Sequence, residues 1–269
     1  MSIFFEDILK STGGLPPPPM PLPMRTCLFF PWKGGLRDTW SLFASTYNDE
    51  MRQAAVDFIA QGGGNSIICL LSNGDPANPV SFFRDRWGGL VDMRQLDVLE
   101  RWAEKIAIAG GALWPCIFSD GPESAVIRDA PWECHQRALD LLLAHLRPYS
   151  PGTCIGLESN ENLDCARHNR FANLLRYLAP DRYVVSHLQA VPAGGVPALD
   201  GVFYEHPWPP GEGNSYSPEE CVSEAAAARA RFGGLLLVAT EYNLDVTGAH
   251  MRAQSRALLD AGFGCGGPC

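Results

Sequence analysis

Two glutamates stand out because each lies at the end of a nearly uninterrupted apolar run. Glu161 follows the run TCIGLES, and Glu241 lies in the run LLLVATEY. Two carboxyl groups can divide the work of breaking a glycosidic bond: one protonates the leaving oxygen, and the other attacks or stabilises the oxocarbenium-like carbon. Two such acids about 5 Å apart repel each other, so the pKa of one rises and it can act as an acid near neutral pH. The pair therefore predicts a candidate acid/base and a candidate nucleophile.

Polar and aromatic side chains at the ends of the other apolar runs are candidates for binding a substrate. Aromatic rings offer flat apolar faces to the C–H faces of sugars. The predicted substrate-binding residues are Asn160, Trp32, His187, Tyr204, His206, Trp208 and Tyr242. Glu158 is interpreted as structural and Glu205 as structural or as a residue of the rim, and strand alternation predicts that Glu158 lies on the opposite face from Glu161. The sequence has no residues at the spacing typical of a metal site and no phosphate-binding loop, so we expect neither a metal nor an organic cofactor.

Apolar runs and helical segments alternate along the chain, and these elements must position the candidate residues. Near-continuous apolar runs are typical of strands that are buried on both faces. The expected strands are 25–30, 66–72, 112–119, 153–159, 183–189, 201–206, 235–242 and 261–265. The expected helices are 46–60, 94–108, 132–147, 167–178, 218–231 and 248–260.

Alternation of eight strands with helices predicts an α/β fold, specifically a (β/α)8 TIM barrel formed by residues 24–269. The active face of such a barrel is the ring of carboxyl ends of its strands. Residues 1–23 are expected to form a short N-terminal helix and a proline-rich arm, and residues 190–200 contain too much Pro and Gly for a full helix. The chain stops soon after the eighth run, so we expect the last helix to be absent and the N-terminal helix to cover either the gap or the bottom of the barrel. A truncated chain or a subunit contact explains this ending equally well.

Two motifs carry a resemblance to a known family. GLESNEN (156–162) resembles the strand-four Asn-Glu motif of the clan A retaining glycoside hydrolases, the superfamily of cellulases, mannanases and β-galactosidases. LLLVATEYN (235–243) resembles the strand-seven nucleophile motif of the same clan. The resemblance implies that Glu161 is the acid/base, that Glu241 is the nucleophile, and that Asn160 binds the sugar 2-hydroxyl.

The sequence also departs from the pattern of that clan. Asn162 stands where proline often follows the acid/base, and we find no arginine near the end of the second run and no tryptophan on the eighth. The resemblance implies that either Tyr204 or His206 supports the nucleophile. Trp208 or Trp32 is the candidate replacement for the missing aromatic platform.

Composition narrows the classes of partner. The 269 residues carry a formal net charge of -9, which disfavours binding to nucleic acid phosphates. No uncharged apolar stretch approaches about 18 residues, so no membrane span is expected. The first residues have no basic segment of a secretory signal, and the nine cysteines are odd in number and scattered. These features predict a cytoplasmic protein, with release by lysis or association with a virion as alternatives; the oligomeric state is left open.

The sequence therefore favours a retaining glycosidase that cleaves a β-linked oligo- or polysaccharide by double displacement, with a carbohydrate as partner. The first rival is a catalytically inactive carbohydrate-binding or structural barrel, such as a component of a virion or surface assembly. A lyase or isomerase that uses the same glutamates is a third, less favoured hypothesis. A separation of about 5–5.5 Å between the two catalytic carboxyl groups would indicate retention, and a separation of roughly 7–9 Å would suggest inversion.

Overall fold

The computed structural model describes most of the region that was expected to form the barrel. The described residues are 24–26, 28–73, 80–82, 91–119, 129–207, 216–242 and 248–266. The predicted N-terminal helix and proline-rich arm (1–23) lie outside them, as does Trp208. The expectation about an eighth helix concerns the chain after Gly266, which also lies outside the described residues.

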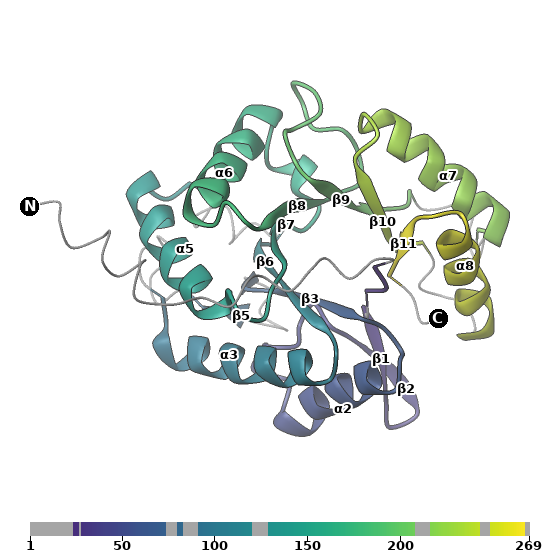
Figure 1. Cartoon of the computed structure of the whole chain (residues 1–269), viewed down its shortest axis with the longest axis horizontal. Helices are drawn as coiled ribbons and strands as arrows, with labels where there is room; N and C mark the ends of the chain where they lie inside the picture. Colours follow the sequence, from purple (N-terminus) through teal and green to yellow (C-terminus); the bar gives the residue numbers. More distant parts are fainter. Residues whose placement is uncertain are drawn as a thin grey trace, which may run out of the picture.

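A parallel sheet lies at the centre of the molecule (Figure 1). Its strands follow the order β11-β10-β9-β8-β7-β6-β3. Their bounds are β3 (Ser66–Leu70), β6 (Ala112–Phe118), β7 (Gly152–Gly156), β8 (Tyr183–Leu188), β9 (Gly201–Glu205), β10 (Leu236–Glu241) and β11 (Gly264–Cys265). Each strand pairs in parallel with the next in this order, so all carboxyl ends lie at one edge.

A short segment at the start of the described chain joins the two edges of this sheet. Arg25 pairs in parallel with Cys265 of β11, and Thr26 pairs in parallel with Ser66 of β3. The Thr26 N–H donates to the Cys265 carbonyl over 2.7 Å, and the Asn65 N–H donates to the Arg25 carbonyl over 2.8 Å. The parallel segments therefore form a ring, which confirms the expected barrel architecture.

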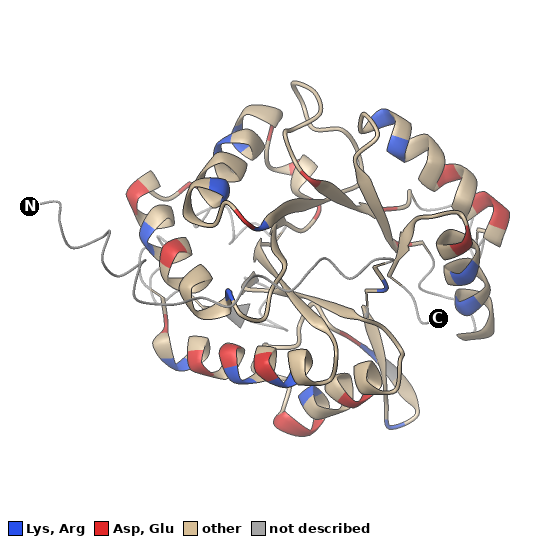
Figure 2. Ribbon diagram, viewed as in Figure 1, with Lys and Arg blue, Asp and Glu red and all other residues tan. Residues whose placement is uncertain are grey.

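The helices lie outside the ring (Figure 1). They are α2 (Asp49–Ala60), α3 (Met93–Ile108), α5 (Trp132–Leu146), α6 (Cys165–Leu178), α7 (Pro218–Arg231) and α8 (Gly248–Asp260). Figure 2 shows that the charged residues lie mostly on these helices and much less on the strands. Residues 189–200 form turns and bends without a helix, as their Pro and Gly content predicted. Among the described helices, none combines the length and apolar character needed to span a membrane.

The first expected strand differs from the observed structure. Residues 25–26 pair within the ring, but β1 (Phe29–Trp32) turns back and pairs antiparallel with β2 (Gly35–Asp38). The turn places Lys33 at φ 43° and Gly34 at φ 86°, and two positive φ values are typical of a tight hairpin. Trp32 therefore lies on a hairpin and not at the end of a barrel strand. A second short antiparallel pair consists of β4 (Ser72–Asn73) and β5 (Val80–Ser81).

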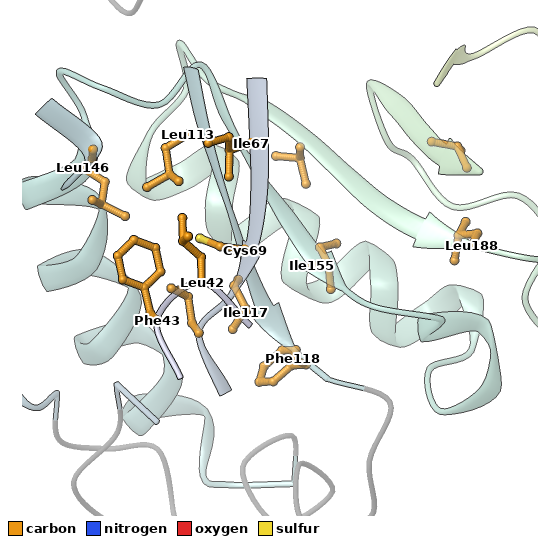
Figure 3. Packing of buried hydrophobic residues seen from close by; sticks show 14 of the residues in the cluster. Leu42, Phe43, Ile67, Cys69, Leu113, Ile117, Phe118, Leu146, Ile155 and Leu188 are labelled. Carbon is orange, nitrogen blue, oxygen red and sulfur yellow. The ribbon is translucent and has the colours of Figure 1, made fainter. Parts of the chain in front are cut away.

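Two apolar layers follow from strand alternation. Side chains such as Ile68, Trp114 and Phe203 fill the inside of the ring together with Met24, Leu28 and Trp40. Their sequence neighbours point outward and pack under the helices; Figure 3 shows part of this outer layer, including Ile67, Cys69 and Leu113. Successive strand residues point to opposite faces, so the position of a residue in its strand decides whether it reaches the inside of the barrel.

Candidate active site

Three glutamates meet at the carboxyl edge of the ring. One carboxylate oxygen from each of Glu158, Glu205 and Glu241 lies within 4.8 Å of the other two. Glu158 follows β7, Glu205 ends β9 and Glu241 ends β10. The Glu205 residue is 4% exposed, and the other two are half-buried. Of the three, only Glu241 was expected at the site from the sequence.

A bulge in β10 directs Glu241 toward Glu205. Along β9, Phe203 points inside the ring, so Glu205 two residues later points the same way. Along β10, Ala239 is paired with Tyr204 and Glu241 with Glu205, so β10 contains one extra residue at this point. Such bulges turn a side chain that regular alternation would direct elsewhere. Both carboxyl groups therefore face the same space.

Glu158 reaches the cluster through a left-handed backbone conformation. Strand β7 ends at Gly156, and Glu158 has φ 42° and ψ 36°. Strand alternation does not extend to this position, so it does not decide whether Glu158 lies on the face opposite Glu161, and that orientation stays a prediction. A left-handed residue other than glycine is costly and persists only where its surroundings support it. One support is the hydrogen bond from the Glu158 N–H to Nδ1 of His187, over 3.2 Å.

His187 connects this turn to β10. Its side chain is fully buried, and burial lowers its pKa to about 3, so the ring is neutral at ordinary pH. Since Nδ1 accepts from Glu158, the proton is on Nε2, which donates to Oγ1 of Thr240 over 2.9 Å. Thr240 in turn donates to the carbonyl of Tyr204 over 3.0 Å. The same Nε2 lies 3.9 Å from Oε1 of Glu241.

Trp40 also contacts Glu241, although it follows no barrel strand. Its Nε1 donates to Oε1 of Glu241 over 3.1 Å, a bond to a charged acceptor when this carboxyl is ionised. Its ring meets His187 edge to face, with the centroids 5.3 Å apart. Its carbonyl accepts from the Leu70 N–H, which ties this segment to the end of β3. Trp40 was not predictable from the ends of apolar runs, because it follows none of them.

The two residues of the Asn-Glu motif lie beside the cluster, on the short helix η1 (Ser159–Glu161). The Ser159 hydroxyl contacts β8 through the Ser186 hydroxyl, 2.6 Å away. Oδ1 of Asn160 accepts from the Gln189 N–H over 2.8 Å. Glu161 is exposed, and its charge acts on Glu205, so both acids belong to the same mouth of the barrel.

Glu205 is the carboxyl group most altered by this environment. Burial, followed by the charges of Glu241 and Glu161, raises its pKa to about 7. Hydrogen bonds with Gln189 and Glu158 oppose the rise. The Gln189 bond is explicit in the geometry, because Nε2 donates to Oε1 of Glu205 over 2.9 Å. The site therefore contains one carboxyl that gains and loses its proton near neutral pH.

Three predicted substrate-binding side chains face the helices instead of the barrel mouth. Tyr204, His206 and Tyr242 are at most 3% exposed. The Tyr204 hydroxyl donates to Glu224 of α7 over 2.7 Å, and Nε2 of His206 contacts a backbone carbonyl of α7. The Tyr242 hydroxyl pairs with Ser255 of α8 over 2.6 Å. The inward-facing residue of the Tyr204–His206 segment is Glu205, which alternation counted from Phe203 would have found.

Of the two tryptophans predicted to lie at the rim, the structure describes only Trp32. Trp32 lies on the β1–β2 hairpin, where it packs against the outer apolar layer and Lys33 lies over its ring at 4.7 Å. Trp208 lies outside the described residues, so its predicted role in sugar stacking stays a prediction. Of the residues predicted to form the site, Glu241 and His187 adjoin the carboxyl cluster, and Asn160 and Glu161 lie next to it.

Comparison with solved structures identifies proteins of the same architecture. An exo-β-1,4-mannosidase from Opitutaceae bacterium strain TAV5 superposes with a TM-score of 0.60 at 16% identity, over 90% of this chain and 51% of that chain. A β-mannanase from the blue mussel Mytilus edulis gives a TM-score of 0.61 at 12% identity, over 90% and 85%. A glycoside hydrolase family 5 enzyme from Prevotella bryantii B14 gives 0.58 at 12%, over 90% and 86%.

These likenesses establish the fold. The chain is an α/β barrel of the kind found in glycoside hydrolases of family 5. It spans about half the length of the mannosidase chain and most of the length of the other two. No protein-family model and no curated protein matches the sequence.

Proposed function

We propose that this protein is a retaining glycoside hydrolase that cleaves β-linked oligo- or polysaccharides. The observation that carries the proposal is the position of Glu241, which a bulge places at the mouth of the barrel within 4.8 Å of a second and a third carboxyl. Retention is part of the proposal because the motifs that carry Glu161 and Glu241 resemble those of the clan A retaining enzymes; a separation of about 5–5.5 Å between these two carboxyl groups would support it, and one of roughly 6.5–9.5 Å would indicate inversion. The shared fold with family 5 glycoside hydrolases supports the same reaction class.

Glu241 is the proposed nucleophile. Trp40 donates to its Oε1, and the neutral His187 ring lies nearby, so the carboxylate is oriented without being neutralised. Its oxygen attacks the anomeric carbon as the bond to the leaving oxygen breaks, which forms a covalent glycosyl ester. A fixed orientation of this kind lowers the barrier because the attacking atom needs no reorganisation.

Glu161 is the proposed acid/base. It is exposed at the mouth, where a leaving group departs and water enters, and it follows Asn160 in the motif that resembles the strand-four motif of clan A. In the first step it gives its proton to the glycosidic oxygen. In the second step it removes a proton from water, which attacks the glycosyl ester and releases the sugar and Glu241.

The decisive experiment is hydrolysis by the wild-type chain and four variants. A panel of β-1,4-mannosides and β-1,4-glucosides is the first choice, since two proteins of similar fold are named as a β-1,4-mannosidase and a β-mannanase. Glu241→Gln should lose nearly all turnover with an unchanged circular dichroism spectrum. Glu219→Gln, an exposed glutamate of α7, is the matched control and should retain wild-type rates.

Azide separates the two roles. In Glu161→Gln, azide should restore turnover of an aryl β-glycoside, whose leaving group departs without protonation, and give the β-glycosyl azide, because a small nucleophile can attack the glycosyl ester without base assistance. Restoration by azide in Glu158→Gln, but not in Glu161→Gln, would move the acid/base role to Glu158. If the wild type binds sugars from the panel but hydrolyses none, the protein is a binding barrel and the proposal fails.

A further inference from the structure

A buried histidine away from the carboxyl cluster is hydrogen-bonded to the short helix that carries Asn160 and Glu161. His168 lies on α6, and its side chain is fully buried. Its Nδ1 lies 2.9 Å from the Asp164 carbonyl oxygen. Its Nε2 lies 2.9 Å from the hydroxyl oxygen of Ser159, the first residue of η1. Helix α6, outside the ring, is therefore joined directly to the turn at the mouth of the barrel.

The chemistry of the partners fixes where the protons lie. A backbone carbonyl only accepts, so Nδ1 of His168 donates to Asp164. Burial lowers the pKa of His168, so the ring is neutral at ordinary pH and its Nε2 has no proton. The Ser159 hydroxyl therefore donates to Nε2, and the Ser186 hydroxyl of β8, 2.6 Å away, donates to Ser159. The His187 carbonyl oxygen lies 3.2 Å from the same hydroxyl, farther than either partner.

Ser159 is the residue that anchors η1. Its carbonyl accepts from the Leu163 N–H over 2.8 Å and from the Asn162 N–H over 3.2 Å, so its main chain closes the turn while its side chain attaches the turn to α6 and β8. Ser159 is 3% exposed, whereas Glu161, two residues later, is exposed. An exposed side chain has little packing of its own, so the position of the Glu161 carboxyl depends on the backbone of η1.

We propose that His168 is a positioning residue for Glu161 and that it acts through the hydroxyl of Ser159. This inference rests on the proposed function, in which Glu161 protonates the leaving oxygen. Attachment of η1 to two different elements restricts its rotation, which would otherwise carry the Glu161 carboxyl away from the glycosidic oxygen. A misplacement of about 1 Å is enough to lower a catalysed rate about a hundredfold.

The first test examines the network without a substrate, so it does not depend on the proposed glycosidase activity. Proton–nitrogen correlation spectra of the full chain, with ¹⁵N-labelled histidine, distinguish the two neutral tautomers of each ring. We expect His168 to carry its proton on Nδ1; its signals are those missing from His168→Gln. In Ser159→Ala the Nε2 resonance of His168 should move, because Nε2 loses its donor.

Ser150→Ala is the matched control for this test. Ser150 is buried, and its hydroxyl donates to the Gly152 carbonyl at the amino end of β7, away from η1. Its substitution should leave the Nε2 resonance of His168 unchanged. A His168 ring with its proton on Nε2, or an Nε2 resonance that does not respond to Ser159→Ala, would overturn the proposal.

The second test asks whether the network positions an acid. It compares dinitrophenyl and phenyl β-glycosides of the sugar, mannose or glucose, that the wild type hydrolyses, because dinitrophenolate departs without protonation and phenolate does not. The quantity measured is kcat/KM, which reports the steps up to cleavage of the glycosidic bond. His168→Leu and Ser159→Ala should each lower it about tenfold to a hundredfold for the phenyl glycoside, but less than about threefold for the dinitrophenyl glycoside. Ser150→Ala should keep the wild-type ratio.

Two further variants show whether His168 acts through Ser159. In His168→Gln the amide oxygen can accept from Ser159 in place of Nε2, so most of the rate on the phenyl glycoside should return. The double variant His168→Leu with Ser159→Ala should lose little more than Ser159→Ala alone, because both changes break the same bond. Ser159→Ala removes only one hydroxyl and serves alone if His168→Leu does not fold.

The outcomes separate this proposal from the proposed function. Equal losses on the two glycosides would show that the network supports only the fold, and additive losses in the double variant would show that His168 does not act through Ser159. Inactivity of the wild type together with the expected His168 tautomer would refute the proposed function, and with it the catalytic role of the network, but not the network itself.

Discussion

At the scale of single residues, the orientation of Glu241 depends on a side chain far away in the sequence. Trp40 donates to Oε1 of Glu241 over 3.1 Å, and its ring meets the His187 ring edge to face. A hydrogen bond to a charged group contributes about 1.5–3 kcal/mol, so its removal is measurable in kinetics. The aromatic body of Trp40 also belongs to the apolar filling of the barrel, which a phenylalanine would largely preserve.

Trp40→Phe should therefore lower kcat for β-glycoside hydrolysis by about tenfold to a hundredfold, because the nucleophile loses its N–H donor. The midpoint temperature of thermal unfolding should change little, because phenylalanine keeps most of the apolar contacts. Trp102→Phe is the matched control: Nε1 of Trp102 is buried in α3 and has no acceptor among the described residues, so its removal should leave kcat unchanged. Equal effects of the two substitutions on kcat would show that Trp40 acts only by packing.

Residue types and spacing predicted part of this site. Glu241 and His187 were found because they end apolar runs, and the chain brings both to the cluster. Glu205 was missed as a site residue although alternation along β9 from Phe203 directs it inward. Glu158 was not predictable in this way, because a left-handed turn after β7 follows no periodicity.

At the scale of elements, close packing of β11 against β10 maintains the bulge that orients Glu241. The chain after β11 passes so near β10 that a Cβ on Gly266 would lie 2.4 Å from the Thr240 carbonyl oxygen and 2.7 Å from its Cα. Both atoms are backbone, so relief requires a shift of β10 itself. Thr240 lies between the two register positions where the bulge occurs.

Gly266→Ala should accordingly reduce kcat/KM through displacement of the bulge, with a loss of stability of about 1–3 kcal/mol. Gly152→Ala is its counterpart at the opposite end of the barrel. A Cβ there would lie 2.4 Å from the Tyr183 carbonyl oxygen and 2.5 Å from the Trp114 ring. Gly152→Ala should lower the free energy of unfolding in urea by a comparable amount, yet leave kcat/KM of the folded protein close to the wild-type value. Similar kinetic losses in both variants would argue against the role of the bulge.

The boundaries of one helix were predicted well although its apolar periodicity is weak. Helix α7 (Pro218–Arg231) has the expected bounds and begins with a capping box between Ser217 and Glu220. The first apolar run was interpreted as one strand, but it is divided between the ring and a hairpin. The reason is local: two successive positive φ values at Lys33 and Gly34 reverse the chain, and apolar content alone does not indicate such a turn.

At the scale of the whole molecule, the ring closes through very few residues. Alternation of strands and helices indicated a parallel sheet, and the number of runs indicated closure. The closure itself depends on Arg25 and Thr26, each of which pairs with a different edge of the sheet. The helices pack around the ring through the outer apolar layer, so the fold tolerates the absence of a helix between β8 and β9.

The response of global stability to pH gives the last prediction. His187 has a pKa of about 3 in the folded chain, below the ordinary 6.5, so it stabilises the protein above pH 6.5 and this contribution is lost as the pH falls toward 3. Burial lowers the pKa of His168 and His206 in the same direction. Glu205 has the opposite sign: its pKa rises from 4.5 to about 7, so its contribution is complete below pH 4.5 and is lost as the pH rises through 7.

The contribution of Glu205 to the free energy of unfolding should therefore fall by roughly 2–3 kcal/mol between about pH 5 and pH 8, given 1.36 kcal/mol per pKa unit, while the contribution of the buried histidines rises over the acid part of this range, so the Glu205 effect is the difference between wild type and Glu205→Gln. Urea unfolding across this range measures it. Glu205→Gln, which has no proton to lose, should abolish the alkaline decline but keep the acid one, which comes from the buried histidines. Glu219→Gln should behave as the wild type. A decline that persists in Glu205→Gln would mean that another group, and not the carboxyl cluster, limits stability above neutral pH.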